Sequence, residues 1–193
     1  MRLLQTGFGK DGGIGSPLTP KGYYLDEVIS VLQKEIRRGK EYEAVYWAVE
    51  LESFNARALW NRLRVIASED VGVAEPHAPL IVSALESAYW DAKEKKKGES
   101  VLFFVNAVVI LARAPKCRVA DDLMITLIDS VERGERLEMP DYAVDKHTFR
   151  GRRMGRGVKH FVEEGSRIAN EGADNPYRET AERILLRDEE DKK

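Results

Sequence analysis

The amino-acid sequence predicts an all-α protein, built as an antiparallel bundle or array of six to eight helices. Apolar residues return at spacings of three and four through successive segments between residues 25 and 133, as in helices with one buried face. Glycines and prolines stand between these segments, where helices end or begin. No segment alternates apolar and polar residues beside turn residues, so we expect no sheet.

The first helix is expected to begin at Tyr24 or Leu25 and to end before Gly39, because glycine is favoured just beyond a helix C-terminus. Pro79 suits the first turn of a helix, whereas Pro115 stops one. The later helices are expected over residues 41–51, 56–68, 79–97, 100–114 and 119–133.

Two of these segments carry distinct burial predictions. The segment 100–114 is apolar nearly all round, so we expect it to be the central, fully packed helix. The segment 119–133 has a single apolar stripe that is expected to face inward. The residues of that stripe are Leu123, Leu127, Ile128 and Val131.

Composition divides the chain into three parts. Residues 1–21 are rich in glycine and proline and are expected to form an irregular arm. Residues 22–140 carry the helical periodicity and form the predicted helical domain. Residues 141–193 are expected to be a Gly/Arg-rich crossover and C-terminal helices, near 160–169 and 177–186, packed on the same domain.

The composition also excludes several classes of protein. The 193 residues carry a formal net charge of −2, so the whole molecule is not a polycation that coats nucleic acid. Cys117 is the single cysteine, which excludes an internal disulfide and favours a reducing, cytoplasmic location. The longest apolar run, 101–112, is too short to span a membrane, so we expect no membrane partner.

A specific sequence block lies at the end of the third predicted helix. Residues 62–76 read RLRVIASEDVGVAEP, and residues 111–116 read LARAPK. Together with residues 28–34 and 44–47, in this order, they resemble the C-terminal domain of the MgsA/RarA family of clamp-loader-like AAA+ ATPases. The matching motif residues are Arg62, Arg64, Ser68, Glu69, Asp70, Pro115 and Lys116.

The resemblance implies a helical domain that follows the ATPase and holds subunits together in DNA replication and repair. It therefore implies a homo-oligomer, a tetramer or a dimer, with a separate AAA+ ATPase or DNA as further partners. The family's ATPase and lid domains have no counterpart in this sequence. Residues 7–11, GFGKD, lack the glycine spacing and the Ser or Thr of a Walker A loop. We expect no ATP hydrolysis by this chain alone and no cofactor.

Glu69 and Asp70 end a helix, where the helix dipole disfavours negative charge. Such acids need partners. We favour pairing with arginines packed nearby over a catalytic carboxylate pair, because buried charges are usually paired. Pairing across a subunit interface is an intermediate interpretation.

The Gly/Arg-rich stretch leaves three interpretations open. Its cations, with glycines between them, suit phosphate or nucleic-acid contact. Its histidines and acids are candidates for a small hydrolase or a phosphate-handling enzyme, and a bound metal is the weaker possibility. The third interpretation is a structural crossover whose arginines pair with surface acids. The cations are Arg150, Arg152, Arg153, Arg156 and Lys159; the catalytic or metal candidates are Asp145, His147, His160 and Glu164. We favour a non-enzymatic oligomerisation and interaction module.

Overall fold

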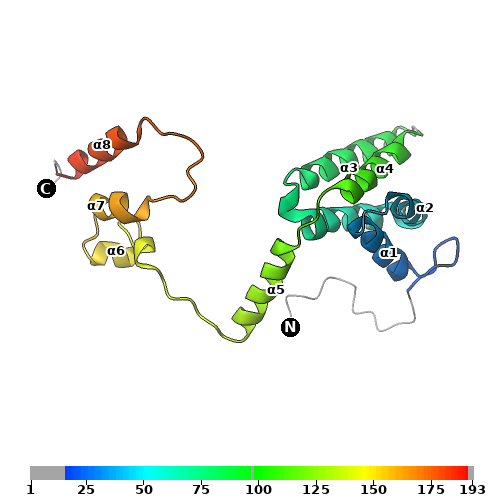
Figure 1. Ribbon diagram of the computed structural model, residues 1–193, viewed down its shortest axis with the longest axis horizontal. Coiled ribbons are helices and arrows are strands. Elements are labelled where there is room, and N and C mark those ends of the chain that lie inside the picture. The colour runs from blue at the N-terminus through cyan, green and yellow to red at the C-terminus, as the bar shows by residue number, and fades with distance from the viewer. Residues whose placement is uncertain (1–15, 97, 191–193) are drawn as a thin grey trace. The chain divides into compact units, whose positions relative to one another are not determined.

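The computed structural model describes residues 16–96 and 98–190, and the chain divides into two compact units between Gly134 and Glu135. Every regular element in these residues is helical (Figure 1). The one β-bridge in the described ranges joins Leu18 and Tyr24. This confirms the all-α prediction. Most of the predicted arm, including residues 7–11, lies outside the described residues.

The first unit begins with a helical hairpin. Helix α1 (Leu25–Arg37) starts where the sequence predicts, and Gly39 follows it at φ +73°, the left-handed conformation expected beyond a helix end. Helix α2 (Glu41–Ile66) contains a break at Asn55, with φ −153° and ψ 88°. The two helices predicted over 41–51 and 56–68 are therefore both present, and they share the label α2 because they are joined across this kink.

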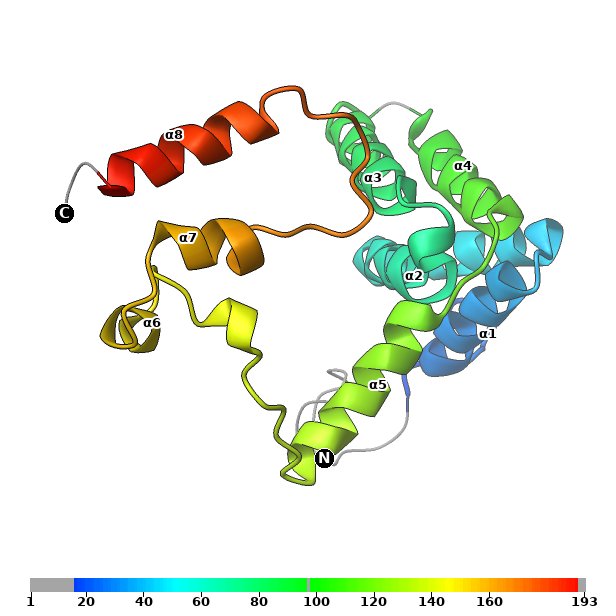
Figure 2. The same ribbon diagram turned by 60° about the vertical axis from the view of Figure 1, so that its left-hand side comes forward.

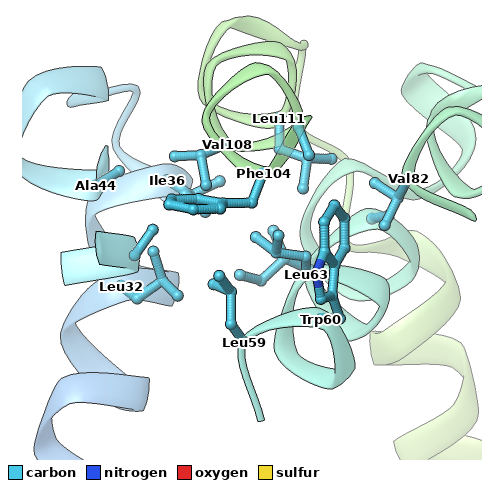
Figure 3. Packing of buried hydrophobic residues seen from close by; sticks show 14 of the residues in the cluster. Leu32, Ile36, Ala44, Leu59, Trp60, Leu63, Val82, Phe104, Val108 and Leu111 are labelled. Carbon is cyan, nitrogen blue, oxygen red and sulfur yellow. The ribbon is translucent and has the colours of Figure 1, made fainter. Parts of the chain in front are cut away.

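A second hairpin completes the core. Helix α3 (Ala78–Glu94) and helix α4 (Ser100–Arg113) pack against each other, and α4 also packs on α1 and α2. Figure 3 shows side chains from all four helices meeting around Phe104, Leu63 and Trp60. The inner face of α4 is buried there, whereas Leu102 on its outer face is exposed. Helix α4 is thus central, but it is not packed on all sides.

Two short helical turns connect the hairpins. A π-helical turn η1 (Ala67–Val71) continues α2, and a 3₁₀ turn η2 (Gly72–Ala74) follows it. Gly72 has φ +53°, so the chain turns after the Ser68-Glu69-Asp70 block in a conformation that favours glycine. The turn brings the buried side chain of Asp70 against α1.

Helix α5 (Val119–Glu132) packs on its unit through η1 and η2 and projects away from the other helices of the first unit (Figures 1 and 2). None of its residues is buried. The prediction that its apolar stripe faces inward is wrong: Leu123 is 55% exposed, Leu127 50% and Val131 67%. An apolar stripe shows that a helix suits a packed surface, but it does not say which surface covers it.

The second unit contains short helical turns and one longer helix. Its elements are η3 (Asp141–Ala143), α6 (Phe149–Arg153), α7 (Val158–His160), η4 (Phe161–Gly165) and α8 (Arg178–Glu190). The helix predicted over 160–169 ends early, at Gly165. The helix predicted over 177–186 is longer than expected, and Asn175-Pro176 precedes it. That residues 141–193 pack on the helical domain stays a prediction.

Candidate functional site

Asp70 is a fully buried carboxylate inside the first unit. Its Oδ1 accepts a hydrogen bond from Nε of Arg37 at 2.5 Å, and its Oδ2 accepts one from the amide of Gln33 at 2.8 Å. A guanidinium nitrogen of Arg118 lies 3.5 Å from Oδ1. A buried charge is tolerated when it is paired and hydrogen-bonded. Asp70 therefore joins α1, η1 and the residue that precedes α5.

Glu69 completes this ion-pair network. Its Oε1 lies 3.1 Å from Arg37 and 3.0 Å from Arg118, so each arginine contacts both acids. Arg118 also pairs with Asp121 on α5. Because guanidinium donors already occupy these carboxylates, the arrangement is suited to holding helices together.

Arg62 and Arg64 lie on the same helix but have different surroundings. Arg62 donates to the side-chain amide oxygen of Gln33 at 2.9 Å, which connects it indirectly to Asp70. Arg64 is 3.5 Å from Glu86 on α3. Ser68, between them and the acid pair, is exposed.

Pro115 and Lys116 follow the end of α4. The ammonium group of Lys116 donates to the backbone carbonyls of Leu111 at 2.9 Å and Ala112 at 3.0 Å. A cation in this place satisfies carbonyls that the helix leaves unpaired. Burial of the ammonium group lowers the pKa of Lys116. The motif residues Pro115 and Lys116 thus end and cap the central helix.

A groove with a volume of 790 Å³ runs between α1 and the second half of α2. Its floor includes apolar side chains, and Lys34, Arg37 and Arg62 bring positive charge to it. Glu69 is the one acidic residue among the described residues that line it. The other lining residues are Leu25, Ile29, Ser30, Gln33, Ala58, Asn61 and Val65.

In the second unit, Asp145 and Thr148 organise the start of α6. The Thr148 hydroxyl accepts from the backbone N–H of Gly151 at 3.0 Å, which caps the helix. Asp145 accepts from the backbone N–H and from the ring nitrogen of His147, both at 2.9 Å. The hydrogen bond from the His147 ring holds the pKa of Asp145 below its usual value. Gly151 lies so close to Asp145 that a β-carbon there would be 1.9 Å from the Asp145 carbonyl oxygen.

Arg156 also makes several contacts within the second unit. Its guanidinium donates to the carbonyl oxygens of Asp141 at 2.8 Å and Val144 at 2.6 Å, and it pairs with the Asp141 carboxylate. His160 lies 3.5 Å from that carboxylate. The hydrogen bond from Arg156 lowers the pKa of Asp141, and His160 contributes to the same shift. The guanidinium group of Arg156 is therefore occupied by contacts within the second unit.

The remaining predicted cations differ in the contacts that their side chains make. Arg152 donates to the His147 carbonyl oxygen at 2.8 Å, and Lys159 is 3.9 Å from Glu163. Arg153 stacks over the ring of Phe149 at 5.6 Å. Arg150 is exposed on the same short helix. The structure thus separates Arg152 and Arg156, which donate to backbone carbonyls of this unit, from the exposed Arg150 and Arg153, for which no such hydrogen bond is found within the described residues.

The four catalytic or metal candidates fall into separate pairs. Asp145 contacts His147, whereas His160 contacts Asp141 and Glu164 lies 3.6 Å from Arg167. In the described ranges no three side chains of the His, Cys, Asp and Glu types are grouped as a metal site requires. The i, i+4 spacing of His160 and Glu164 therefore does not build a shared ligand set here.

Sequence reasoning missed Gln33, Arg37 and Arg118, the partners of the acid pair. One signal was available: Gln33 interrupts the apolar stripe of α1 and is buried, at 8% exposed. A polar residue on an inward face needs a buried hydrogen-bond partner. The sequence does not say which residue that partner is, because Asp70 lies 37 positions away.

These features define a helical domain whose motif residues tie helices together. The chain matches the family model "MgsA AAA+ ATPase C terminal" over residues 40–170. Because this match covers more than half of the chain, the chain belongs to that family, and the predicted resemblance is confirmed.

Relatives in three bacteria carry the name replication-associated recombination protein A. The Bacillus subtilis protein is 28% identical over 138 residues, which cover 69% of this chain and 31% of the relative. The Escherichia coli K12 protein is 33% identical over 133 residues, 66% of this chain and 27% of the relative. The Haemophilus influenzae protein is 29% identical over 126 residues, covering 63% and 26%. The matched region spans less than a third of each of these relatives.

No helix in the described ranges has the length and apolar character needed to cross a membrane.

Proposed function

We propose that this chain is a non-enzymatic association module in replication-associated recombination, and that its copies join through helix α5. The observation that carries the proposal is the apolar face of α5, which the other helices of the first unit do not cover. Val119, Leu123, Leu127 and Val131 follow one another at spacings of four, and each is at least half exposed. Spacings of four keep side chains on one face of a helix, so they form a continuous stripe.

An uncovered stripe of this length favours association. Exposed apolar surface that is contiguous is unfavourable in water, and burying it against a second molecule is stabilising. The start of α5 is fixed to the helical core, because Arg118, the residue just before α5, forms ion pairs with Glu69 and Asp70. The family match supports the same function, since it assigns residues 40–170 to a domain of an AAA+ ATPase. An AAA+ ATPase on another polypeptide, or DNA, is the proposed further partner, and the cytoplasm is the proposed compartment.

The test is the mass of the full chain carrying Leu123→Asp and Leu127→Asp, measured by size-exclusion chromatography with light scattering. We expect the wild-type chain to have a multiple of 21.9 kDa and the double variant to be a monomer. The matched control is Leu80→Asp with Leu102→Asp, because these leucines are at least as exposed but lie on α3 and α4. An assembly that survives the α5 changes contradicts the proposal.

Contact with nucleic acid through α6 is a second candidate function. Phe149 is 69% exposed and Met154 53%, and Arg150 and Arg153 flank them around a shallow pocket of 460 Å³. An exposed aromatic ring beside arginines suits a single strand, because bases stack on the ring and phosphates meet the guanidinium groups. This observation favours a single strand over a duplex as the nucleic-acid partner.

A further inference from the structure

Helix α5 is joined to the helical core near its first turn. None of its residues is buried, and within the first unit it packs mainly on the turns η1 and η2 (Figure 2). The apolar core that fixes α1, α2, α3 and α4 against one another contains no residue of α5. Burial of apolar side chains therefore contributes little to the orientation of this helix.

Arg118, the residue just before α5, forms the main polar connection. One of its guanidinium nitrogens lies 3.0 Å from Glu69 and 3.5 Å from Asp70, and both acids belong to η1. The other terminal nitrogen pairs with Asp121 in the first turn of α5. We call these four residues the Arg118 bridge. A guanidinium group presents its donors in a rigid planar fork, so the bridge sets a direction for α5 as well as a distance.

The backbone before α5 is held by the core as far as Cys117. Its N–H donates to the Asp70 carbonyl oxygen at 2.9 Å. The helix itself begins with the hydrogen bond from the N–H of Asp122 to the Arg118 carbonyl oxygen, also at 2.9 Å. Arg118, with φ −94° and ψ 12°, therefore stands between the fixed segment and the helix. Rotation about its backbone bonds turns α5 as a rigid body, and the Arg118 bridge opposes that rotation.

We propose that α5 is an arm with two orientations, held in one by the Arg118 bridge and released when the ion pairs of the bridge are broken. The Arg118 side chain is 36% exposed and that of Glu69 26%, so water and dissolved ions reach both groups. When Arg118 leaves, the buried Asp70 keeps its ion pair with Arg37. The core therefore retains a paired carboxylate in both orientations. Release changes the direction of the apolar stripe of α5 and does not require a second copy of the chain.

The test measures the distance between α3 and α5 by pulsed electron paramagnetic resonance. Spin labels are attached to the full chain at Ser87→Cys and Ser130→Cys, and Cys117→Ser removes the native thiol. The contacts of Cys117 described above use its backbone, so the serine is expected to preserve them. An excess of unlabelled chain suppresses distances between copies. For this reference chain at low salt we expect one narrow distance distribution.

Arg118→Ala in the reference chain is expected to broaden the distribution or to add a second distance. Arg113→Ala is the matched control, because its ion pair with Glu41 joins α4 to α2 and lies outside the bridge. We expect the control to stay narrow. A narrow distribution for Arg118→Ala, or equal broadening in the two variants, contradicts the proposal.

A second variant protects the test against loss of the fold. Tryptophan fluorescence shows whether the core is intact, since all three tryptophans lie in the first unit. If Arg118→Ala fails this check, Asp121→Asn decides the matter, because it breaks the bridge on the α5 side and leaves Glu69 and Asp70 with both arginines. We expect it to broaden the distribution as well. A narrow distribution for a folded Asp121→Asn chain then overturns the proposal.

Salt gives an independent readout of the ion pairs. Between about 0.05 M and about 1 M NaCl we expect the released fraction of the reference chain to rise at least about two-fold, because salt screens charges that water reaches. Arg118→Ala has no bridge to screen, so its distribution is expected to be independent of salt. A reference chain that does not respond to salt, or an equal response in Arg118→Ala, contradicts release through the Arg118 bridge.

Discussion

Gly72 and Cys117 meet backbone to backbone: a β-carbon at Gly72 would stand 2.6 Å from the carbonyl oxygen of Cys117. The N–H of Cys117 donates to the Asp70 carbonyl oxygen at 2.9 Å. This hydrogen bond and the close approach of Gly72 hold the segment before α5 against the η1–η2 turn. This close approach sets where α5 leaves the helical core. It also explains why a glycine is needed in the turn, since its φ is +53°.

Gly72→Ala is therefore expected to lower the free energy of unfolding by about 2 kcal/mol or more, from left-handed strain and the contact with the Cys117 backbone. Urea denaturation followed by tryptophan fluorescence measures this loss, because all three tryptophans lie in the helical core unit. Gly98→Ala is the control, since nothing lies within 4 Å of a β-carbon there. Equal stabilities for the two variants reject this account of the turn.

Asp70→Asn is expected to destabilise the helical core by about 2–3 kcal/mol, because it leaves the Arg37 charge with less compensation beside a buried site. Asp129→Asn, which removes an acid from a pair that is well exposed on both sides, is expected to change stability by less than about 0.5 kcal/mol. The same urea titration compares them. A small effect at Asp70 shows that the ion-pair network contributes little to the fold.

The second unit is expected to lose stability in acid. Hydrogen bonds from Arg156 and His147 lower the folded-state pKa of Asp141 and of Asp145 below their unfolded values. Stability from such groups is fully present above the unfolded pKa, near 4, and is lost as the pH falls through the lower folded value. Amide NMR signals of Thr148 and Gly151, followed from pH 6 to pH 2, report this unit directly. Asp145→Asn is expected to weaken the pH dependence, and an unchanged profile assigns it to other groups.

The arginines of the Gly/Arg-rich stretch are expected to separate by role. Arg156→Ala removes two carbonyl contacts and an ion pair, so it should disorder the Thr148 and Gly151 amide signals. Arg150→Ala with Arg153→Ala should leave those signals in place and weaken binding of a labelled single-stranded oligonucleotide several-fold, with a smaller salt dependence. Unchanged oligonucleotide binding by the double variant rejects α6 as a nucleic-acid contact.

Local sequence signals located most helices. Gly39, Pro79 and Pro115 each act through backbone geometry that a neighbouring segment does not alter, so the ends they predict are present. The predicted separation of the helices over 41–51 and 56–68 is also present, since Asn55 between them has non-helical backbone angles. The sequence does not predict the end of η4 at Gly165. A β-carbon at Gly165 would be 3.3 Å from the Asp145 carboxylate, a tertiary contact that no local pattern reveals.

The candidate site was less accessible to sequence reasoning. The Ser68-Glu69-Asp70 block is recognisable, but Gln33 and Arg37 reach it from a different helix, and only the folded chain brings them together. The exposure of α5 posed a different difficulty. Its apolar period is the same whether a helix packs inside its own chain or against another molecule, so periodicity does not distinguish the two.

The mass of the wild-type chain across a concentration series tests the central claim most directly. We expect light scattering or sedimentation equilibrium to give a discrete multiple of 21.9 kDa, a dimer or a tetramer, at tens of micromolar, with dissociation on dilution. The apolar face of α5 is then covered by another copy. A mass of 21.9 kDa at every concentration contradicts association through α5 and removes the basis of the proposed function.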